Sequence, residues 1–405
     1  MRIAYINHSY PPMISGAALV VHELATQMSR LGHSVLVLAA SDRGGMYTQE
    51  KDGLKVVRLR SLPNRLRVNQ NFVLFSQNRM LAELQAFRPD VIHIHEPFFL
   101  GLPALLYGNK AGIPVIFTTH QLPWIAYAHL QNFSVLQRPA EQLLWVYGKW
   151  FLKRCSAIIA PSKTTAAYLE ANTGRAASVI SSSVDLELFK PEPDFAVEKE
   201  SLCQRYGLDA ELPVILYVGR LDVDKQVEIV IKAAVQVLRS VPAQVLIVGD
   251  GTQRPKLLKQ AAESGFGTRF HFPGFITQDA DLPGLYRLAA VFVNASVIET
   301  QGIVLLEAAA SGLPVVAVRG TSVHEIVQHG VNGFLIRPGH PDLIAERVEW
   351  LLQHPYRAKE MGAAGRGIAA LHSVDRTIEL YETLCLAVAR EASTPMSYSH
   401  SHSPG

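Results

Sequence analysis

The chain of 405 residues is 48% hydrophobic and 18% charged, and its formal net charge is +3. These proportions exclude a disordered or fibrous protein and predict two or three ordinary globular domains. The sequence has no uninterrupted apolar run of about 18 residues, the length that a membrane-spanning helix needs, and no basic, apolar leader precedes a first strand beginning at Arg2. We therefore expect a cytoplasmic location. The three cysteines form no CxxC pair, which argues against a disulfide framework and a cysteine metal site.

Short β-branched runs alternate with segments of helical periodicity, and the pattern occurs twice. In the first half the runs are residues 2–8, 34–40, 90–96, 114–120, 157–162 and 178–181. After the proline-rich, acidic residues 188–195 they are residues 213–220, 244–251, 269–275, 291–296, 314–318 and 333–336. This alternating α/β pattern predicts two Rossmann-like, doubly wound parallel-sheet domains that face each other across a cleft. Ligands are expected to bind outside the carboxyl ends of the strands.

The domain boundaries follow from the same pattern. We expect an N-terminal domain over residues 1–190 and a C-terminal domain over residues 191–372, with a helix at about 373–390 packing back on the first domain. Residues 391–405 form a polar tail that we expect to be disordered, its two histidines solvated. Residues 1–185 hold 18 Lys and Arg against 10 Asp and Glu, whereas the remainder holds 20 against 25, so the halves have different partners.

Two glutamates, Glu299 and Glu307, flank the start of an expected helix. The strand "VFVNAS" ends before Glu299, residues 299–302 form a turn, and "IVLLEAAAS" is helical until Gly312. A helix start suits a diphosphate because of its free N–H groups and dipole, and Gly302 allows close approach. Glu307 can then accept bonds from a ribose diol, while Glu299 projects toward a sugar. The spacing indicates a nucleotide-sugar site; the alternative is a solvated carboxylate pair.

The loop "YVGRLDVDKQ" (217–226) follows another strand and supplies two cations, Arg220 and Lys225. They are suited to neutralise a diphosphate leaving group as the glycosidic bond breaks, a task that a metal performs in other enzymes. The triplet DVD at 222–224 also matches a DxD metal motif. Because it lies between two cations, a solvated turn is the better interpretation.

Together, "GRLDVDK" and "VNASVIETQGIVLLEAAASGLPVVA" resemble the family 4 retaining glycosyltransferases, which have the GT-B fold and carry two glutamates separated by seven residues as a signature. The resemblance spans most of the chain. It includes "YPPMISGAALVVHELATQMSRLGHSV" (10–35), "DVIHIHEP" (90–97), "TTH" (118–120), "PSKTTAAYL" (161–169) and "SVDLELFKP" (183–191).

The resemblance implies a donor site in the C-terminal domain, an acceptor site in the N-terminal domain, and no essential metal or other cofactor. It implies that Arg220 and Lys225 bind the diphosphate and that Glu299 holds the donor sugar. His120 contacts the sugar across the cleft, and Gly16 lies by the phosphate and the acceptor. The other implied donor-binding residues are Gly219, Asp250, Gly251, Phe275, Ile276, Thr300, Gln301, Gly302, Ile303 and Glu307.

Three positions depart from the family pattern. The usual paired glycine is Ser15-Gly16, the glycine after the loop lysine is Gln226, and a Pro-Asn-Gly is replaced by the serines at 181–183. The first change leaves Gly16 as the only flexible residue of its pair. None removes a charge from the donor contacts.

Three histidines near strand ends require a choice between roles. His93 and His95 alternate on one strand and face the same way, as two metal ligands would, but no third ligand is evident. Buried or cleft-lining histidines are therefore the better interpretation. His120 could be a satisfied core histidine, yet its strand-end position and the resemblance favour contact with the donor.

The N-terminal half has aromatic and basic residues that suit a membrane surface. Residues 121–156 contain three of the four tryptophans, and the nearby cations are Lys149, Lys153, Arg154, Arg58, Arg60, Arg65 and Arg67. On an anionic bilayer each such cation contributes about 1 kcal/mol. The alternative is an inter-domain helix with buried tryptophans. The tetrad Glu-Thr-Gln-Gly (299–302) also resembles lipid glycosyltransferases that modify diacylglycerol, so we expect a UDP-linked hexose donor and a lipid or glycan acceptor at the inner face of the membrane.

Other functional classes remain to be distinguished. A nucleotide-sugar hydrolase or epimerase would consume the donor without an acceptor, and a non-catalytic nucleotide-sugar-binding protein would not consume it. A glycosidase would place its carboxylates about 5–9.5 Å apart across the scissile bond and would leave the cationic loop unused. No nucleic-acid-binding motif accompanies the basic half, so we expect no nucleic-acid partner.

Overall fold

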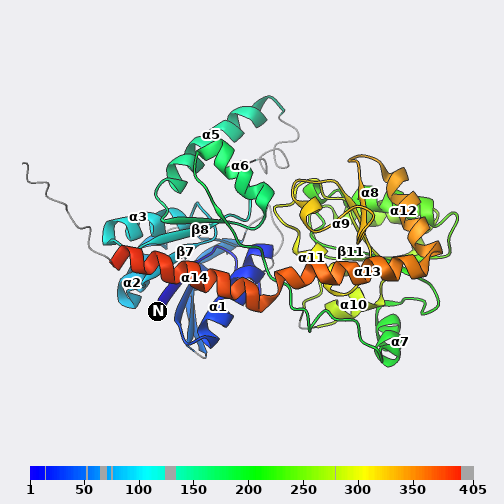
Figure 1. Ribbon diagram of the computed structural model, residues 1–405, viewed down its shortest axis with the longest axis horizontal. Helices are drawn as coiled ribbons and strands as arrows, with labels where there is room; N and C mark the ends of the chain where they lie inside the picture. Colours follow the sequence, from blue (N-terminus) through cyan, green and yellow to red (C-terminus); the bar gives the residue numbers. More distant parts are fainter. Residues whose placement is uncertain are drawn as a thin grey trace, which may run out of the picture.

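The computed structural model describes residues 1–13, 15–51, 53–63, 71–73, 76–123, 134–278 and 280–393. Over these residues the chain forms two α/β domains, each built on its own sheet (Figure 1). The predicted pair of doubly wound parallel-sheet domains is confirmed. The first three residues of the expected polar tail, 391–393, are instead the end of the last helix, and the rest of the tail lies outside the described residues.

Within the described ranges, the N-terminal sheet has eight strands in the order β10-β9-β8-β7-β1-β2-β4-β3. The predicted strands are β1 (Arg2–Ile6), β2 (Ser34–Ala40), β7 (Val91–Ile94), β8 (Val115–Thr118), β9 (Ala157–Ala160) and β10 (Ser178–Val179). The sequence pattern did not predict β4 (Leu54–Leu59), which is parallel to β2, or β3 (Tyr47–Lys51), which closes the edge antiparallel to β4. A separate small hairpin joins β5 (Ser61–Pro63) to β6 (Asn71–Val73).

The C-terminal sheet has the order β13-β12-β11-β14-β15-β16, and its described strand pairs are parallel. The strands are β11 (Val214–Val218), β12 (Gln244–Val248), β13 (Phe270–Gly274), β14 (Val291–Asn294), β15 (Val315–Val318) and β16 (Gly333–Ile336). The order reverses between β11 and β14, the switch point beside which ligands bind in such sheets. Loops after these two strands carry the cations and the glutamate pair.

Helices cover both faces of each sheet, because strands buried on two sides must be packed from two sides. In the N-terminal domain these are α1 (Gly16–Arg30), α2 (Gln77–Phe87), α3 (Gly101–Ala111), α5 (Ser134–Leu152) and α6 (Lys163–Thr173). The later helices are α7 (Ala196–Tyr206), α8 (Val227–Val237), α9 (Arg254–Ala262), α10 (Leu282–Leu288), α11 (Ile303–Ala310), α12 (Pro341–Gln353), α13 (Pro355–Ala369) and α14 (Val374–Ser393).

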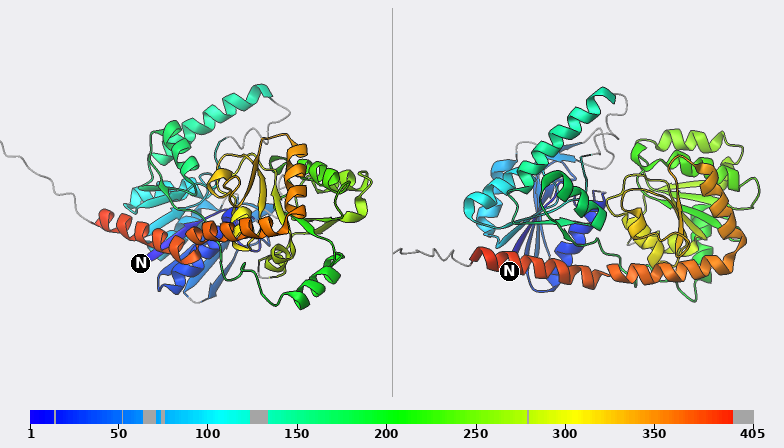
Figure 2. Two further views of the ribbon diagram at one scale, coloured as in Figure 1. Left: turned by 45° about the vertical axis from the view of Figure 1, so that its right-hand side comes forward. Right: turned by 45° about the horizontal axis from the view of Figure 1, so that its top comes forward.

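The last helix returns to the first domain. In Figures 1 and 2, α13 lies along the C-terminal domain and α14 continues beside the N-terminal domain. Ile378, Tyr381 and Cys385 of α14 are buried in the same core cluster as Val21 of α1. This helix therefore ties the two domains together, and Ile303 of the predicted site packs against the same core cluster.

Candidate functional site

The predicted site residues gather on loops that follow parallel strands in both domains. Gly16 begins α1 after β1, and His120 follows β8. In the C-terminal domain the residues follow β11, β12, β13 and β14 in turn: Gly219, Arg220 and Lys225; Asp250 and Gly251; Phe275 and Ile276; and Glu299, Thr300, Gln301, Gly302, Ile303 and Glu307.

Both cations of the loop after β11 form ion pairs with carboxylates. The guanidinium of Arg220 contacts Asp222, and its second terminal nitrogen lies 2.9 Å from Asp224. The Nζ of Lys225 lies 2.7 Å from Oε1 of Glu299, so the loop after β11 is joined to the loop after β14. The DxD triplet thus serves as a counter-charge for Arg220. Among the described residues, no cluster of three His, Cys, Asp or Glu side chains could hold a metal ion.

The helix start predicted after Glu299 is present, because α11 begins at Ile303. Gly302 precedes it with a φ of +91°, and a Cβ there would lie 2.9 Å from Leu305, so this position requires glycine. The backbone of Glu299 is held by residues that the sequence did not single out. Its N–H donates to Thr321 Oγ1 at 3.0 Å, and its carbonyl accepts from Ser322 Oγ at 2.7 Å.

Glu307 is buried, with 3% of its surface exposed, and both of its oxygens accept hydrogen bonds from side chains. Gln278 donates from 2.5 Å and Tyr286 from 2.7 Å. Burial raises the pKa of Glu307, and these two hydrogen bonds oppose that rise. A carboxylate oxygen can accept more than one bond, so a fixed Glu307 retains the capacity to accept a ribose hydroxyl.

The loop after β12 packs directly on the cation loop. A Cβ on Gly251 would lie 2.5 Å from the carbonyl group of Leu221, so only glycine allows the two backbones this close. The carbonyl of Asp250 accepts from the N–H of Leu221 at 2.9 Å. Phe275 after β13 is 40% exposed, while Ile276 packs against the core.

Contacts between the domains bring His120 and the Glu299 loop together. Thr300 Oγ1 donates to the carbonyl of His120 at 3.2 Å. The carbonyl of Thr300 accepts from Ser162 Oγ at 2.7 Å and from Thr165 Oγ1 at 3.1 Å. Ser162 is also the N-cap of α6, a role that a serine before a helix makes predictable from the sequence. Its hydrogen bond to the other domain could not be predicted in this way.

The side chains of Gln301 and Glu325 also form hydrogen bonds between the domains. The Oε1 of Gln301 accepts from the N–H of Ser182 at 2.7 Å, and Gln301 is 4% exposed. Its side chain therefore faces the linker between the domains. Glu325, at the end of the short helix Val323–Glu325, accepts from the first N–H groups of α6, those of Lys163 at 2.9 Å and Thr164 at 2.8 Å.

The start of α1 approaches the start of α11. Ser15 caps α1 by accepting from the N–H of Ala18 at 3.0 Å. A Cβ built on Gly16 would lie 3.7 Å from Cδ1 of Ile303, so the two helix starts lie side by side. The serine that replaces the usual first glycine thus has a capping role.

The predicted basic surface is only partly present. Arg58 is wrong as a member of it, because it is 1% exposed and donates to the carbonyls of Tyr10 and Ala40 at 3.0 and 3.3 Å. Arg65, Arg67 and Trp124 lie outside the described residues. No helix in the described part of the chain has the length and apolarity to cross a membrane.

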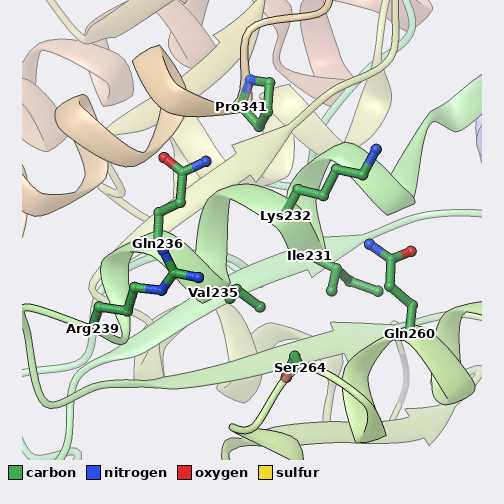
Figure 3. A pocket seen from close by; sticks show the side chains of 8 residues that line it. All are labelled: Ile231, Lys232, Val235, Gln236, Arg239, Gln260, Ser264 and Pro341. Carbon is green, nitrogen blue, oxygen red and sulfur yellow. The ribbon is translucent and has the colours of Figure 1, made fainter.

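A separate depression of about 670 Å³ lies between α8, α9 and the start of α12 (Figure 3). Its polar lining includes Lys232, Arg239 and Gln260. None of the predicted site residues lines it, so this hollow is not the candidate active site.

Comparison with known proteins identifies the chain's relatives. Residues 14–188 match the family Glycosyltransferase Family 4, and residues 198–367 match Glycosyl transferases group 1. An alpha-monoglucosyldiacylglycerol synthase of Acholeplasma laidlawii is 26% identical over 82% of this chain and 84% of its own length. A D-inositol 3-phosphate glycosyltransferase of Frankia alni is 30% identical over 88% and 90%.

A solved structure shares the fold. The structure of HepE from Anabaena in complex with UDP-glucose has a TM-score of 0.73 and 22% identity, covering 95% of this chain and 99% of that one. At this identity the likeness bears on the fold alone. The two facing domains, the glutamate pair with its cationic loop and the matches over both halves show that the chain belongs to the family 4 glycosyltransferases of GT-B fold.

Proposed function

We propose that the protein is a retaining, metal-independent glycosyltransferase that moves a hexose from a UDP-linked donor to a hydroxyl of a lipid or glycan acceptor at a membrane surface. One observation carries the proposal. Arg220 and Lys225 converge with Glu299 at the start of α11, and Thr300 of the same loop is bonded to His120 of the opposite domain.

The ion pairs of this loop suggest how a diphosphate is received. Arg220 and Lys225 are balanced by Asp222, Asp224 and Glu299. An entering diphosphate offers the cations new partners, and displacing Lys225 from Glu299 would free that carboxylate for donor hydroxyls. Because the DxD carboxylates are already paired with Arg220, cations of the chain can neutralise the leaving group, and the departing diphosphate can help to deprotonate the acceptor.

The ligand and the name of two similar proteins support the substrate classes. The Anabaena structure is a complex with UDP-glucose, and the Acholeplasma laidlawii relative is named as a synthase of monoglucosyldiacylglycerol. We propose a UDP-hexose donor on the first basis and a lipid acceptor on the second, with a glycan as the other acceptor class. His120 would contact the sugar, and Glu307 the ribose.

An exposed face of α5 supports a lipid acceptor. Leu143 and Val146 are 71% and 68% exposed, and Trp150 follows on the same face one turn later. Exposed Lys149 and Lys153 lie beside them. We call these five residues the α5 surface; Figures 1 and 2 show α5 extending along the edge of the N-terminal domain. Apolar side chains flanked by lysines suit the boundary of an anionic bilayer.

The catalytic proposal is tested by incubating the purified chain with UDP-glucose, with and without diacylglycerol vesicles. We expect UDP release that requires the acceptor, a glycolipid with the α linkage of the donor, and no loss of rate with a chelator. Donor consumption without acceptor would assign a hydrolase instead, and binding without consumption would assign a non-catalytic protein. A β-linked product would reject the retaining mechanism.

The membrane proposal is tested by flotation with vesicles of anionic or zwitterionic lipid. We expect flotation with anionic vesicles and its loss in Val146→Asp. Val197→Asp is a matched control, since Val197 is an 80% exposed valine on α7 of the other domain. Equal behaviour of the two variants would reject the α5 surface as the contact.

A further inference from the structure

Three histidine rings stand in a row at the carboxyl edge of the N-terminal sheet. His93 lies on β7, His95 directly follows it, and His120 follows the neighbouring β8. The ring centroids of His93 and His95 are 4.2 Å apart, and those of His95 and His120 are 5.1 Å apart with planes inclined by 20°. His93 and His95 are buried and His120 is partly exposed, so the row leads from the core to the domain interface.

A hydrogen bond within the row reaches the candidate catalytic histidine. His95 Nδ1 lies 2.8 Å from His120 Nε2. His93 is bonded elsewhere, with its Nε2 2.7 Å from Thr118 Oγ1. His95 thus holds His120, whereas His93, two residues earlier in the chain, does not. With Nε2 engaged, Nδ1 is the ring nitrogen of His120 that remains for a ligand.

The second nitrogen of His95 indicates which ring donates. His95 Nε2 is buried and has no hydrogen-bond partner. A hydrogen placed there would be a buried, unpaired N–H, which native structures rarely contain. The hydrogen of His95 therefore belongs on Nδ1, from which it donates to His120 Nε2. His120 must then carry its own hydrogen on Nδ1.

The rings are neutral around neutral pH, as this arrangement requires. Burial lowers the pKa of His93 to about 3 and that of His120 to about 4. Burial also lowers the pKa of His95, and the two neighbouring imidazoles lower it further. A protonated His120 would have no acceptor on Nε2 for the hydrogen of His95.

We propose that His95 is a positioning residue that fixes His120 as the Nδ1–H tautomer, so that His120 presents a hydrogen-bond donor to a hydroxyl of the donor sugar. The sugar contact rests on the proposed function; the tautomer does not. A neutral donor of fixed orientation can hold a sugar hydroxyl without adding a third cation to Arg220 and Lys225 beside the diphosphate.

The tautomer is measured by ¹⁵N NMR of the imidazoles in the full chain at neutral pH, with the His120 signals assigned by their loss in His120→Gln. We expect Nδ1–H in the wild type. His95→Phe should release His120 to a mixture of tautomers, and His95→Asn should restore the wild-type state, because its amide N–H replaces Nδ1–H. His93→Phe is the matched control and should leave the tautomer unchanged.

Kinetics provide the second readout. We expect His95→Phe to lower kcat about tenfold, equivalent to about 1.4 kcal/mol, with the KM for acceptor unchanged, and His95→Asn to recover most of it. An Nε2–H tautomer of His120 in the wild type would overturn the proposal even if His95→Phe did not fold, as would an unchanged tautomer in folded His95→Phe. If the tautomers respond as expected but the wild type transfers no sugar, the proposed function fails and the control of His120 by His95 stands.

Discussion

The two sides of the interface handle charge in opposite ways. On the C-terminal side, Arg220 and Lys225 are partly exposed and paired with carboxylates. On the N-terminal side, His93 and His95 are buried and neutral, and fixed hydrogen bonds set their orientation. The difference teaches how the proposed function divides the work: we expect the first side to exchange charged partners and the second to present one hydrogen bond in one direction.

The largest expected effect is on the charged side. Lys225→Ala should lower kcat by about 100- to 1,000-fold, as loss of one preorganised donor to a developing oxyanion does. The measurement is the rate of acceptor-dependent UDP release. Lys232→Ala is the control, because Lys232 lies on α8 of the same domain and lines the separate depression. A near-normal rate for Lys225→Ala would contradict the role of Lys225 in neutralising the leaving group.

The next effect tests the neutral side through stability. The pKa of His93 is about 3 in the folded protein and about 6.5 in an unfolded chain. Between these values the unfolded state binds more protons, so the free energy of unfolding falls as the pH falls. The maximum slope is about 1.4 kcal/mol per pH unit for each such histidine.

Urea denaturation of the wild type and of His93→Phe at a series of pH values measures this slope. We expect the dependence below about pH 6.5 to be shallower in the variant by about one proton. Parallel curves would mean that His93 binds a proton in the folded protein, contrary to a neutral row.

A smaller effect sharpens the account of how the two sides meet. Glu325→Gln should weaken the capping of α6, a contribution of about 0.5–2 kcal/mol for a full N-cap. We expect kcat/KM to fall by several-fold with little loss of binding to UDP alone. Glu346→Gln on the surface of α12 is the control, since among the described residues the only ion pair of Glu346 is with its neighbour Arg347. Equal kinetics for both variants would contradict a role of Glu325 in domain placement.

The smallest effect concerns Gln226, which holds a left-handed φ of +49° where the family usually has glycine. Gln226→Gly should raise the free energy of unfolding by roughly 0.5 kcal/mol, because glycine avoids the left-handed penalty but has more freedom to lose. Arg88→Gly is the comparison, because Arg88, the C-cap of α2 in the N-terminal domain, has a similar φ of +51°. If Gln226→Gly lowered the free energy of unfolding and Arg88→Gly did not, the side chain of Gln226 would be shown to support the cation loop.

Periodicity was sufficient to predict the twelve parallel strands that frame the site. Continuous apolar runs such as Val214–Val218 are buried on both faces and leave a strong signal. The edge strand Tyr47–Lys51 reads "YTQEK", whose polar residues suit an exposed edge but carry little strand signal. The sequence pattern therefore did not predict this strand, nor did it predict β4, with which the strand pairs.

The candidate site was predictable where charge and glycine carry the chemistry. Arg220, Lys225 and Gly302 were identifiable by residue type at strand ends. Contacts that depend on the packing of two domains were not, because Ser162 and Thr300 are 138 residues apart. The prediction for Arg58 was wrong for a different reason: its partners lie in its own domain, but no local pattern reveals that its guanidinium turns inward to backbone carbonyls.

The central claim is that positive side chains and the start of α11 hold the diphosphate without a divalent ion. Calorimetric titration of UDP into the wild type and Lys225→Ala, each with and without a chelator, tests it most directly. We predict that the chelator leaves the wild-type affinity unchanged and that Lys225→Ala binds about tenfold more weakly or worse. Affinity abolished by the chelator, or undiminished in Lys225→Ala, would contradict the claim.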